Sequence, residues 1–320
     1  MTLRIGVLGA SRIAEAAIVE PARELGFRLV AVAARDPQRA NIFADTYGVE
    51  RVVPTYQDVV TDPEVDVVYN PLANSLHAPW NLAAVAAGKP VLSEKPFARN
   101  RAEAARVASA ADAAGVTVME GFHYLFHPVT QRALALAGDG TLGELRRVEV
   151  RMGMPEPKPD DPRWSLELAG GALMDLGCYG VHVLRRFGVP SILSATAVQR
   201  SAGVDATLDA EVVFPSGLTG LTANSMVQDD FSFTLRLIGS RGEAFVHNFI
   251  KPRDDDRLTV QTDDGTRVER FGTRASYTYQ LESFARHVLH GAPLPLDTTD
   301  AVENMAVIDE IYRAAGLPVR

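Results

Sequence analysis

Short apolar runs alternate with alanine-rich stretches through the first third of the chain, and this rhythm constrains the fold most strongly. The apolar runs predict strands at residues 5–8, 29–33, 65–69, 90–92 and 116–119. Intervening segments such as 80–87 and 103–113 lack β-branched runs and are rich in alanine, a strong helix former. This alternation predicts an α/β fold with a doubly wound parallel sheet and helices on its faces.

The chain changes character after Phe122. Alternating apolar and polar residues predict strands at 145–152, 193–199, 208–214, 218–226, 231–238 and 244–246. Their period of two indicates a mostly antiparallel, open sheet with one face covered, and helices over 171–187, 277–290 and 299–315 are expected to cover it. Because 320 residues suit two domains, we expect an α/β domain over 1–122 and an α+β domain over 123–320. The C-terminal helix is a candidate to pack back on the first domain.

Charge and cysteine content narrow the environment and the partners. The net charge of −8 disfavours nucleic acid and anionic membranes as partners. The single cysteine, Cys178, forms no internal disulfide, so nothing in the chain requires an oxidising compartment. A strand predicted from Ile5 leaves no room for a signal peptide, and no apolar run is long enough to span a membrane. We therefore expect a cytoplasmic protein.

The run Asp254 to Asp256 is predicted to be a solvated turn, and no metal site is expected.

The turn after the first strand has features of a dinucleotide site. Gly9 supplies a tight turn and Ala14 permits close helix packing, but Ser11 replaces the second glycine of the usual fingerprint. Its hydroxyl can donate to a phosphate instead. The predicted cofactor contacts here are Gly9, Ser11, Arg12 and Ile13, and the alternative is an ordinary strand-to-helix turn.

The end of the second strand bears on the cofactor. Ala34 and Arg35 lie where an acidic residue would accept a hydrogen bond from the ribose 2′-hydroxyl. A guanidinium matches a 2′-phosphate in charge and geometry, so Arg35 favours NADP over NAD. Asp36 leaves an alternative open, because it is either the displaced acid or the start of a turn with Pro37.

Two further stretches carry reactive side chains. Lys95 follows the fourth strand, where a parallel sheet binds ligands, so it is a candidate proton donor or acceptor; the alternative is a solvated lysine. Asp175 and Tyr179 are four residues apart on a predicted helix and share a face, with His182 near it. A carboxylate and a phenol so placed can bind one carbinol. The alternative makes Tyr179 a core residue and Asp175 a partner of the helix dipole.

In its order and spacing of motifs, the chain resembles the Gfo/Idh/MocA oxidoreductases over nearly its full length. The resemblance rests on the glycine turn, on residues 69–77, 94–96, 119–124 and 170–179. It is most similar to the branch with NADP-dependent xylose dehydrogenase, dimeric dihydrodiol dehydrogenase and sugar ketoreductases, in which a tyrosine stands at the position of Tyr179. Ser11 departs from the glycine usual in the family.

The resemblance implies a Rossmann domain that binds NADP, with NAD as second choice, and hydride transfer to or from a sugar, polyol or related diol. Tyr179 and Lys95 would supply the base, since a nearby ammonium lowers the pKa of a phenol; which of them carries the proton stays open. Asp175 would position the carbinol. Further cofactor contacts are expected from Asn74, His77 and Glu94, although His77 is alternatively a helix-start residue.

Substrate contacts are expected from the proline-rich loop before the catalytic helix. Arg163 and Trp164 follow this loop, and His123 and His182 are further candidates; for Arg163 and Trp164 the alternative is packing between domains. The exposed antiparallel sheet predicts a homodimer or homotetramer. Two rival functions remain: an NAD-dependent glycosidase of the same family, with transient oxidation, and a non-catalytic NADP-sensing protein.

Overall fold

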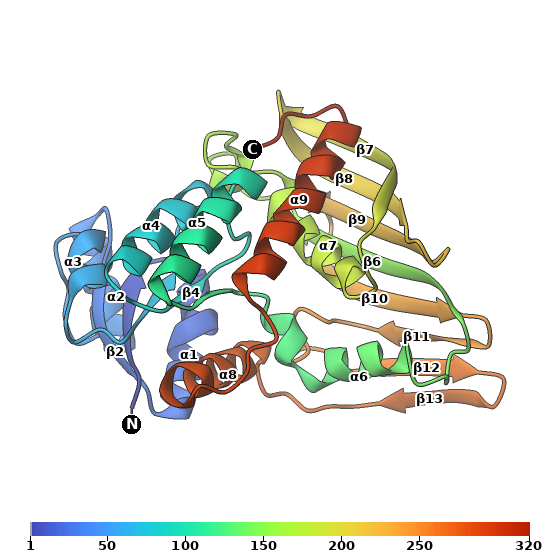
Figure 1. Cartoon of the computed structure of the whole chain (residues 1–320), viewed down its shortest axis with the longest axis horizontal. Coiled ribbons are helices and arrows are strands. Elements are labelled where there is room, and N and C mark those ends of the chain that lie inside the picture. Colours follow the sequence, from blue (N-terminus) through green and yellow to red (C-terminus); the bar gives the residue numbers. More distant parts are fainter. Residues whose placement is uncertain (1) are drawn as a thin grey trace. The chain divides into compact units, whose positions relative to one another are not determined.

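The computed structural model describes residues 2–320 and divides them into two compact units (Figure 1). The first unit contains residues 2–122 and Tyr277–Met305, and the second contains His123–Ser276 and Ala306–Arg320. The second domain was expected to run continuously from 123 to 320. The segment Tyr277–Met305 belongs instead to the first unit, because helical periodicity shows that a helix has an apolar face but not which sheet covers that face.

The first unit is built on a parallel sheet with strand order β2-β1-β3-β4-β5. Its strands are β1 (Arg4–Leu8), β2 (Arg28–Ala33), β3 (Val67–Asn70), β4 (Val91–Ser93) and β5 (Val118–Glu120). Nearly all of their residues are buried, which explains why they appear in the sequence as continuous apolar runs. The predicted parallel α/β sheet is confirmed.

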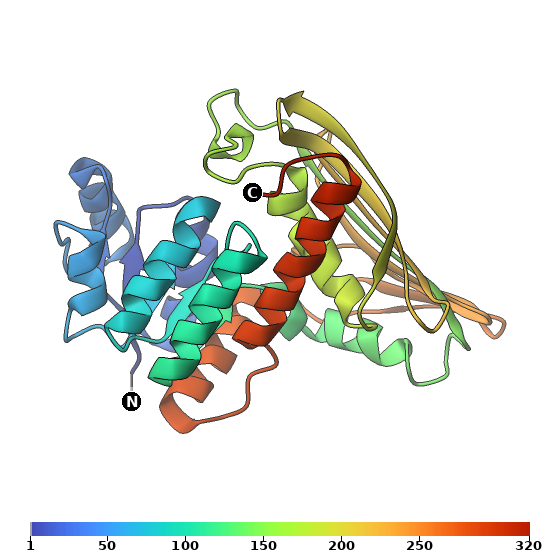
Figure 2. The same cartoon turned by 45° about the horizontal axis from the view of Figure 1, so that its top comes forward.

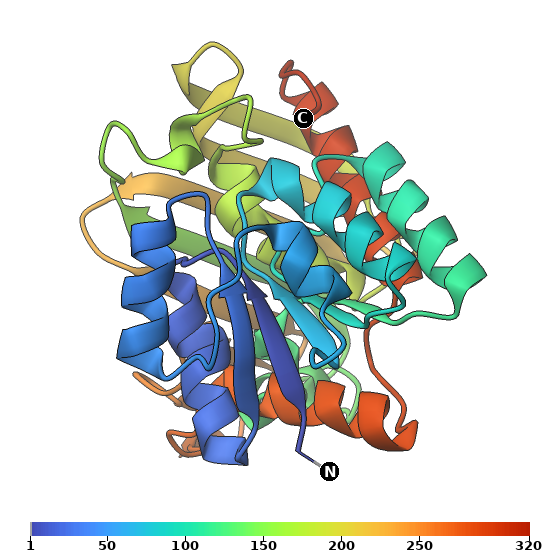
Figure 3. The same cartoon turned by 90° about the vertical axis from the view of Figure 1, so that its left-hand side faces the viewer.

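Helices lie on both faces of this sheet (Figure 3). They are η1 (Glu15–Val19), α1 (Glu20–Leu25), α2 (Pro37–Tyr47), α3 (Tyr56–Thr61), α4 (Asn74–Ala86), α5 (Arg101–Ala114), α8 (Ser276–His290) and the start of α9 (Thr298–Ala314). Helix α8 is joined to this unit by hydrogen bonds: Thr278 Oγ1 donates to Glu24 Oε2 at 3.0 Å, and Thr117 Oγ1 lies 2.8 Å from His287 Nε2. The sequence predicts that this helix covers the antiparallel sheet, whereas residues 277–290 belong to the first unit.

The second unit contains an eight-stranded sheet of order β13-β12-β11-β10-β6-β9-β8-β7, in which only β6 and β9 pair in parallel. Its strands are β6 (Leu145–Pro155), β7 (Ser191–Ser201), β8 (Val204–Val213), β9 (Thr219–Gln228), β10 (Ser232–Gly239), β11 (Gly242–Val246), β12 (Leu258–Thr262) and β13 (Gly265–Glu269). Two helices, α6 (Pro128–Leu136) and α7 (Cys178–Arg185), lie on one face of the sheet (Figure 2). Short 3₁₀ turns, η2 (His123–Phe126) and η3 (Pro162–Trp164), and a π-helical segment, η4 (Leu173–Gly177), complete the unit.

The run Asp254 to Asp256 is not simply a solvated turn. The Asp256 side chain is buried, and one of its oxygens accepts hydrogen bonds from the backbone N–H groups of Phe271 and Gly272, each at 2.8 Å. Arg270 Nη1 donates to the other oxygen at 2.8 Å. Asp256 therefore fixes the segment that follows β13. Among residues 2–320, no group of three or more histidine, cysteine or acidic side chains is placed to hold a metal ion, and no helix is long and apolar enough to cross a membrane.

Candidate active site

The turn between β1 and η1 is fixed by Gly9. Its φ of +86° lies in the region that favours glycine, and its N–H donates to the Ala33 carbonyl at 2.7 Å. A Cβ at this position would lie 2.9 Å from the Leu72 side chain. The turn therefore requires glycine for both its backbone conformation and its packing against the loop after β3.

Ser11 lies in this turn, and its Oγ is buried without a hydrogen-bond partner among residues 2–320. A buried hydroxyl without a partner costs free energy unless a ligand or water bonds to it. Arg12 and Ile13 follow on the exposed side of the turn. A small hydroxyl beside the start of a helix fits a phosphate oxygen, so the residues present suit the pyrophosphate of a dinucleotide.

The segment after β2 supplies two arginines, Arg35 before α2 and Arg39 within it. Arg35 is exposed, while Asp36 accepts a hydrogen bond from the Gln38 N–H at 2.9 Å and caps α2. Because the Asp36 carboxylate is used as a helix cap, the structure favours its turn role over that of a ribose acceptor. Arg39 Nη2 donates to the Ala10 carbonyl at 2.9 Å, which places a second guanidinium beside the glycine turn. The sequence analysis missed Arg39; its position in the first turn of α2 was the available signal.

The loop after β3 leads into α4, which begins at Asn74. His77 is buried in this helix, with Nδ1 2.6 Å from the Pro96 carbonyl oxygen and Nε2 2.8 Å from that of Leu72. Burial lowers the pKa of His77 to about 4, although the two carbonyl acceptors favour the protonated ring. His77 thus ties together the loops that follow β3 and β4, and its contact with a cofactor stays a prediction.

Glu94 and Lys95 follow β4 directly. The Glu94 side chain is buried, and its Oε1 accepts a hydrogen bond from the Tyr69 hydroxyl at 2.9 Å. Burial and the adjacent Glu94 charge raise the pKa of Tyr69 well above its usual value, so this phenol stays a donor. Lys95 is half-buried at the carboxyl end of the sheet. Its proton-transfer role stays a prediction.

In the second unit, Asp175 lies in η4 and Tyr179 lies one turn later in α7. On the opposite face of this helix, Gly177 and Gly180 pack against β9. A Cβ on Gly177 would lie 2.9 Å from Asn224 Nδ2, and a Cβ on Gly180 would lie 2.1 Å from Thr222 Oγ1. The two glycines therefore allow the close approach that holds the Asp175 and Tyr179 face away from the sheet.

Asp175 is paired with Arg163. Arg163 Nε donates to Asp175 Oδ2 at 2.7 Å, and its Nη1 lies 3.2 Å from Asp161 Oδ1. The Asp175 charge raises the pKa of Arg163, against the cost of burial. The Arg163 guanidinium thus lies between two carboxylates and gives Asp175 a charge-assisted hydrogen bond. The structure pairs Arg163 with Asp175, and the contact of Arg163 with a substrate stays a prediction.

Tyr179 belongs to a buried aromatic and polar cluster. Its hydroxyl lies 3.2 Å from His123 Nε2, and His123 Nδ1 lies 2.7 Å from Ser276 Oγ. The Tyr124 hydroxyl lies 2.6 Å from His182 Nδ1. The structure thus brings together three predicted residues, Tyr179, His123 and His182, with Tyr124 and Ser276. No sequence signal pointed to Ser276, which lies more than 150 positions after its partner.

Trp164, a predicted substrate contact, is buried within the second unit. Its side chain is 9% exposed, and its Nε1 donates to the Pro157 carbonyl at 3.2 Å. The Arg200 guanidinium lies 4.6 Å from the centre of the indole ring, over one face. That face is therefore covered within the unit, and stacking of Trp164 on a sugar stays a prediction.

Comparison with known proteins gives the same picture for both units. Residues 3–122 match the model of an oxidoreductase family with an NAD-binding Rossmann fold, and residues 130–245 match the GFO/IDH/MocA C-terminal domain. The D-xylose 1-dehydrogenase (NADP(+)) 2 of Haloferax volcanii is 34% identical over 98% of this chain and 97% of its own length. A dTDP-3,4-didehydro-2,6-dideoxy-alpha-D-glucose 3-reductase of Streptomyces antibioticus is 30% identical, with the same two shares.

A solved structure of similar shape is that of a variant of a 3-ketoreductase from Actinomadura kijaniata, in complex with TDP-benzene and NADP. It superimposes with a TM-score of 0.91 at 25% identity and covers 98% of both chains. Both domains and the full-length likeness agree, and the chain belongs to the Gfo/Idh/MocA family of oxidoreductases.

Proposed function

We propose that this chain is an NADP-dependent oxidoreductase that transfers a hydride between nicotinamide and a carbinol or carbonyl carbon of a sugar, polyol or related diol. The observation that carries the proposal is the pair Asp175 and Tyr179, which share one helix face, with Asp175 held against Arg163. The family and the relatives that act on xylose and on a dTDP-sugar support it.

The first unit would hold the cofactor at the carboxyl end of its sheet. The Gly9 turn and the Ser11 hydroxyl suit the pyrophosphate, while Arg35 and Arg39 suit a 2′-phosphate. The NADP(+) dehydrogenase of Haloferax volcanii and the NADP complex of the 3-ketoreductase support this choice. When bound, the cofactor supplies the hydride acceptor or donor.

The chain's own residues would bind the carbinol and move its proton. The Asp175 carboxylate accepts a hydrogen bond from a substrate hydroxyl and orients the reacting carbon. Tyr179 or Lys95 takes the hydroxyl proton during oxidation and returns it during reduction. His123, bonded to the Tyr179 hydroxyl, orients the phenol.

The function can be tested by titrating the purified protein with NADPH and NADH by fluorescence, and then screening aldoses, inositols and keto sugars at 340 nm. Preferential NADPH binding with turnover of any of these compounds is expected. Tight binding without net redox change would instead favour the glycosidase or the sensor. Absence of binding to either cofactor would contradict the proposal.

We also propose a homodimer or homotetramer assembled through the sheet of the second unit. Strand β7 leaves Leu193 and Val198 each 61% exposed, and Phe231, just before β10, is 58% exposed. Exposed apolar residues on a sheet with open edges favour pairing with a second copy. Sedimentation as a monomer at micromolar concentration would contradict this proposal. The cytoplasm stays the proposed location, since a chain with one cysteine can form no internal disulfide and requires no oxidising compartment.

A further inference from the structure

The helix that carries Asp175 and Tyr179 begins without a cap of its own. Ala172 occupies the cap position and provides no side-chain hydrogen bond. The N–H groups of a first helical turn need acceptors from elsewhere. Leu173 N–H finds one in Asp205 Oδ2, at 2.7 Å, although Asp205 lies 32 residues further along the chain, in β8.

Asp205 is paired with Arg320 in the interior. Both side chains have 0% exposure, and Arg320 Nη2 lies 2.6 Å from Asp205 Oδ1. The Tyr312 hydroxyl donates to the same oxygen at 3.2 Å, and its ring lies 4.0 Å below the guanidinium. The carboxylate therefore has three donors, and the guanidinium is held by charge and by an aromatic face.

Arg320 also binds the other side of the turn that precedes the helix. Its Nε donates to the Gly170 carbonyl at 3.0 Å. Gly171, between the two bonded groups, has φ +123°, and a Cβ there would lie 2.1 Å from Asp205 Oδ1. The ion pair thus fixes the backbone on both sides of Gly171, which explains why this position requires glycine.

We propose that Asp205 and Arg320 are positioning residues for catalysis, which set the orientation of Asp175 and Tyr179 by holding Gly170 and Leu173 on either side of the Gly171 turn. The proposal rests on the proposed oxidoreductase function. An ion pair buried at the start of a helix fixes its direction, and a displacement of about 1 Å at a reacting group costs on the order of 100-fold in rate.

The first test replaces Arg320 by Met. We expect kcat to fall at least tenfold while the Kd for NADPH, measured by fluorescence, changes less than twofold. Arg320→Lys, which keeps a charge for Asp205, should recover part of the lost kcat. The matched control is Arg313→Met, because Arg313 lies at the end of α9, seven residues before Arg320, with a 62% exposed side chain; it should keep the wild-type kcat. Wild-type kcat in Arg320→Met would overturn the proposal.

A second variant separates positioning from stability. Removing one partner of a buried pair leaves an uncompensated charge, whereas replacing both with apolar residues is often tolerated. The double variant Asp205→Leu/Arg320→Met should therefore have a higher Tm than Arg320→Met alone, although the Leu173 N–H and the Tyr312 hydroxyl lose their acceptor, and it should still show the lowered kcat. A folded double variant with wild-type kcat would show that the pair serves stability alone.

Hydrogen exchange provides a readout that does not depend on turnover. Peptides covering Leu173 to Tyr179 should exchange at least tenfold faster in the double variant than in the wild type, while peptides from α5 should not change. Unchanged exchange would overturn the proposal that Asp205 and Arg320 hold the start of this helix. If the wild type itself turns over no carbinol substrate, the proposed function fails, and exchange alone still decides whether the pair fixes this helix.

Discussion

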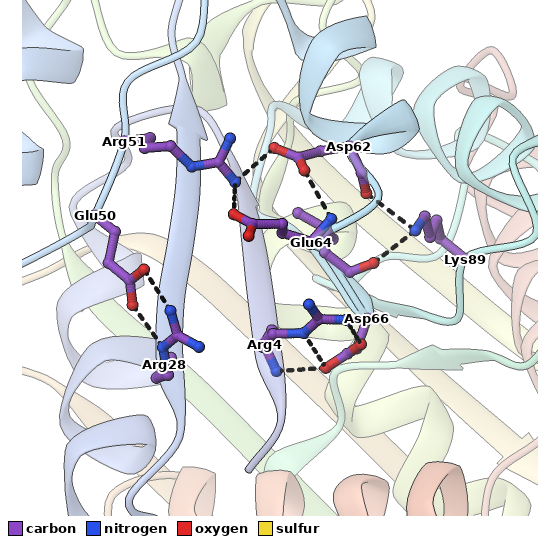
Figure 4. Close-up of polar contacts among 9 residues, drawn as sticks. Arg4, Arg28, Glu50, Arg51, Asp62, Glu64, Asp66 and Lys89 are labelled. Carbon is purple, nitrogen blue, oxygen red and sulfur yellow. Dashed lines mark hydrogen bonds and ion pairs between the residues drawn. The ribbon is translucent and has the colours of Figure 1, made fainter. Parts of the chain in front are cut away.

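Charged side chains lie at both ends of the parallel sheet in the first unit, but they are used differently at each end. At the amino end, shown in Figure 4, they bind one another. The ion pairs are Arg4–Asp66 at 2.7 Å, Arg28–Glu50 at 2.6 Å, and Arg51 with Asp62 at 2.8 Å and with Glu64 at 2.9 Å. Lys89 Nζ donates to the carbonyl oxygens of Asp62 and Val65. A pocket lined by Arg4, Asp66 and Lys89 lies here, among charges that are already paired.

At the carboxyl end, two polar side chains are not used in this way. The Ser11 hydroxyl is buried without a partner, and Arg35 is exposed without an ion pair to any residue in the range 2–320. The charged side chains of the amino end are thus paired within the protein, while the Ser11 hydroxyl and the Arg35 guanidinium of the carboxyl end are not. From this difference we expect ligand binding at the carboxyl end, where Ser11 and Arg35 lie, rather than in the pocket of the amino end.

The largest expected difference between the two ends is in turnover after a lysine at each end is replaced. Replacing Lys95 by Met should lower turnover about 100-fold or more, because it removes a group proposed to share proton transfer. Replacing Lys89 by Met, at the amino end, should leave turnover unchanged. Steady-state kinetics with NADP and a sugar substrate found in the screen measures kcat for both variants. Near-normal turnover of Lys95→Met, with its fold intact by circular dichroism, would exclude this role for Lys95.

Titratable groups at the two ends of the sheet should also change the stability of the protein in different pH ranges. The pKa of His77 is about 4 in the folded chain and about 6.5 when unfolded, so the unfolded state binds the proton first. Stability from neutral His77 is complete above pH 6.5 and declines as pH falls toward 4, by about 2 kcal/mol at pH 5. Urea unfolding at pH 7 and pH 5 should show this decline in the wild type and much less of it in His77→Asn.

The amino end supplies the control for this pH effect. Burial opposes the ionisation of Asp66, but its hydrogen bonds with Arg4 prevail and lower its pKa. Stability from this carboxylate is present above its unfolded pKa of about 3.9 and is lost only as pH falls below that value. Arg4→Ala should therefore leave the difference between pH 7 and pH 5 unchanged. If His77→Asn and Arg4→Ala reduced the stability difference between pH 7 and pH 5 equally, the proposed difference between the two ends would be wrong.

A smaller effect is expected for cofactor choice. Arg35→Ala should weaken NADPH binding about tenfold and NADH binding hardly at all, since only NADPH carries the 2′-phosphate. Arg28→Ala, at the amino end, should alter neither affinity. Fluorescence titration measures both constants. Equal losses for the two cofactors in Arg35→Ala would mean that Arg35 does not recognise the 2′-phosphate.

The smallest effect is expected from the ion pairs of the amino end. The Arg28 and Glu50 side chains are 51% and 38% exposed, so water and salt screen the pair. Arg28→Ala should shift Tm by at most about 4 °C and the shift should shrink further in high salt. A larger, salt-independent loss of Tm would show that this end contributes more than surface ion pairs normally do.

The sequence predicted the strands that carry a strong apolar signal. Continuous buried runs located β1 to β5, and period-two alternation located β6 to β11. Strands β12 and β13 were missed. Strand β13 is almost fully exposed, so its sequence shows no apolar face, and β12 buries only Leu258 and Val260. Helix α4 begins at Asn74, six residues before the predicted start, with Pro79 inside it.

For the candidate site, sequence alone located residues whose positions follow from strand ends and helix spacing, such as Lys95 and the pair Asp175 and Tyr179. It could not find partners brought in from distant segments, such as Ser276 beside His123 or Asp205 beside Leu173. These contacts depend on how loops and strands pack, which local periodicity does not specify. Arg163 was found by sequence, but its contact with Asp175 was not.

The discontinuous first unit has a consequence for biosynthesis. Its α8 buries Leu281 and Phe284 completely, so residues 2–122 lack part of their core until this helix has been made. On the ribosome, an N-terminal domain usually folds before the next one emerges. Here the eight-stranded sheet is fully synthesised before α8 appears. The second unit in turn includes Ala306–Arg320, with Ile308, Ile311 and Tyr312 fully buried, so neither unit can complete its core until the segment after β13 has been made. Both units must therefore wait in a partly folded state while the last helices are synthesised.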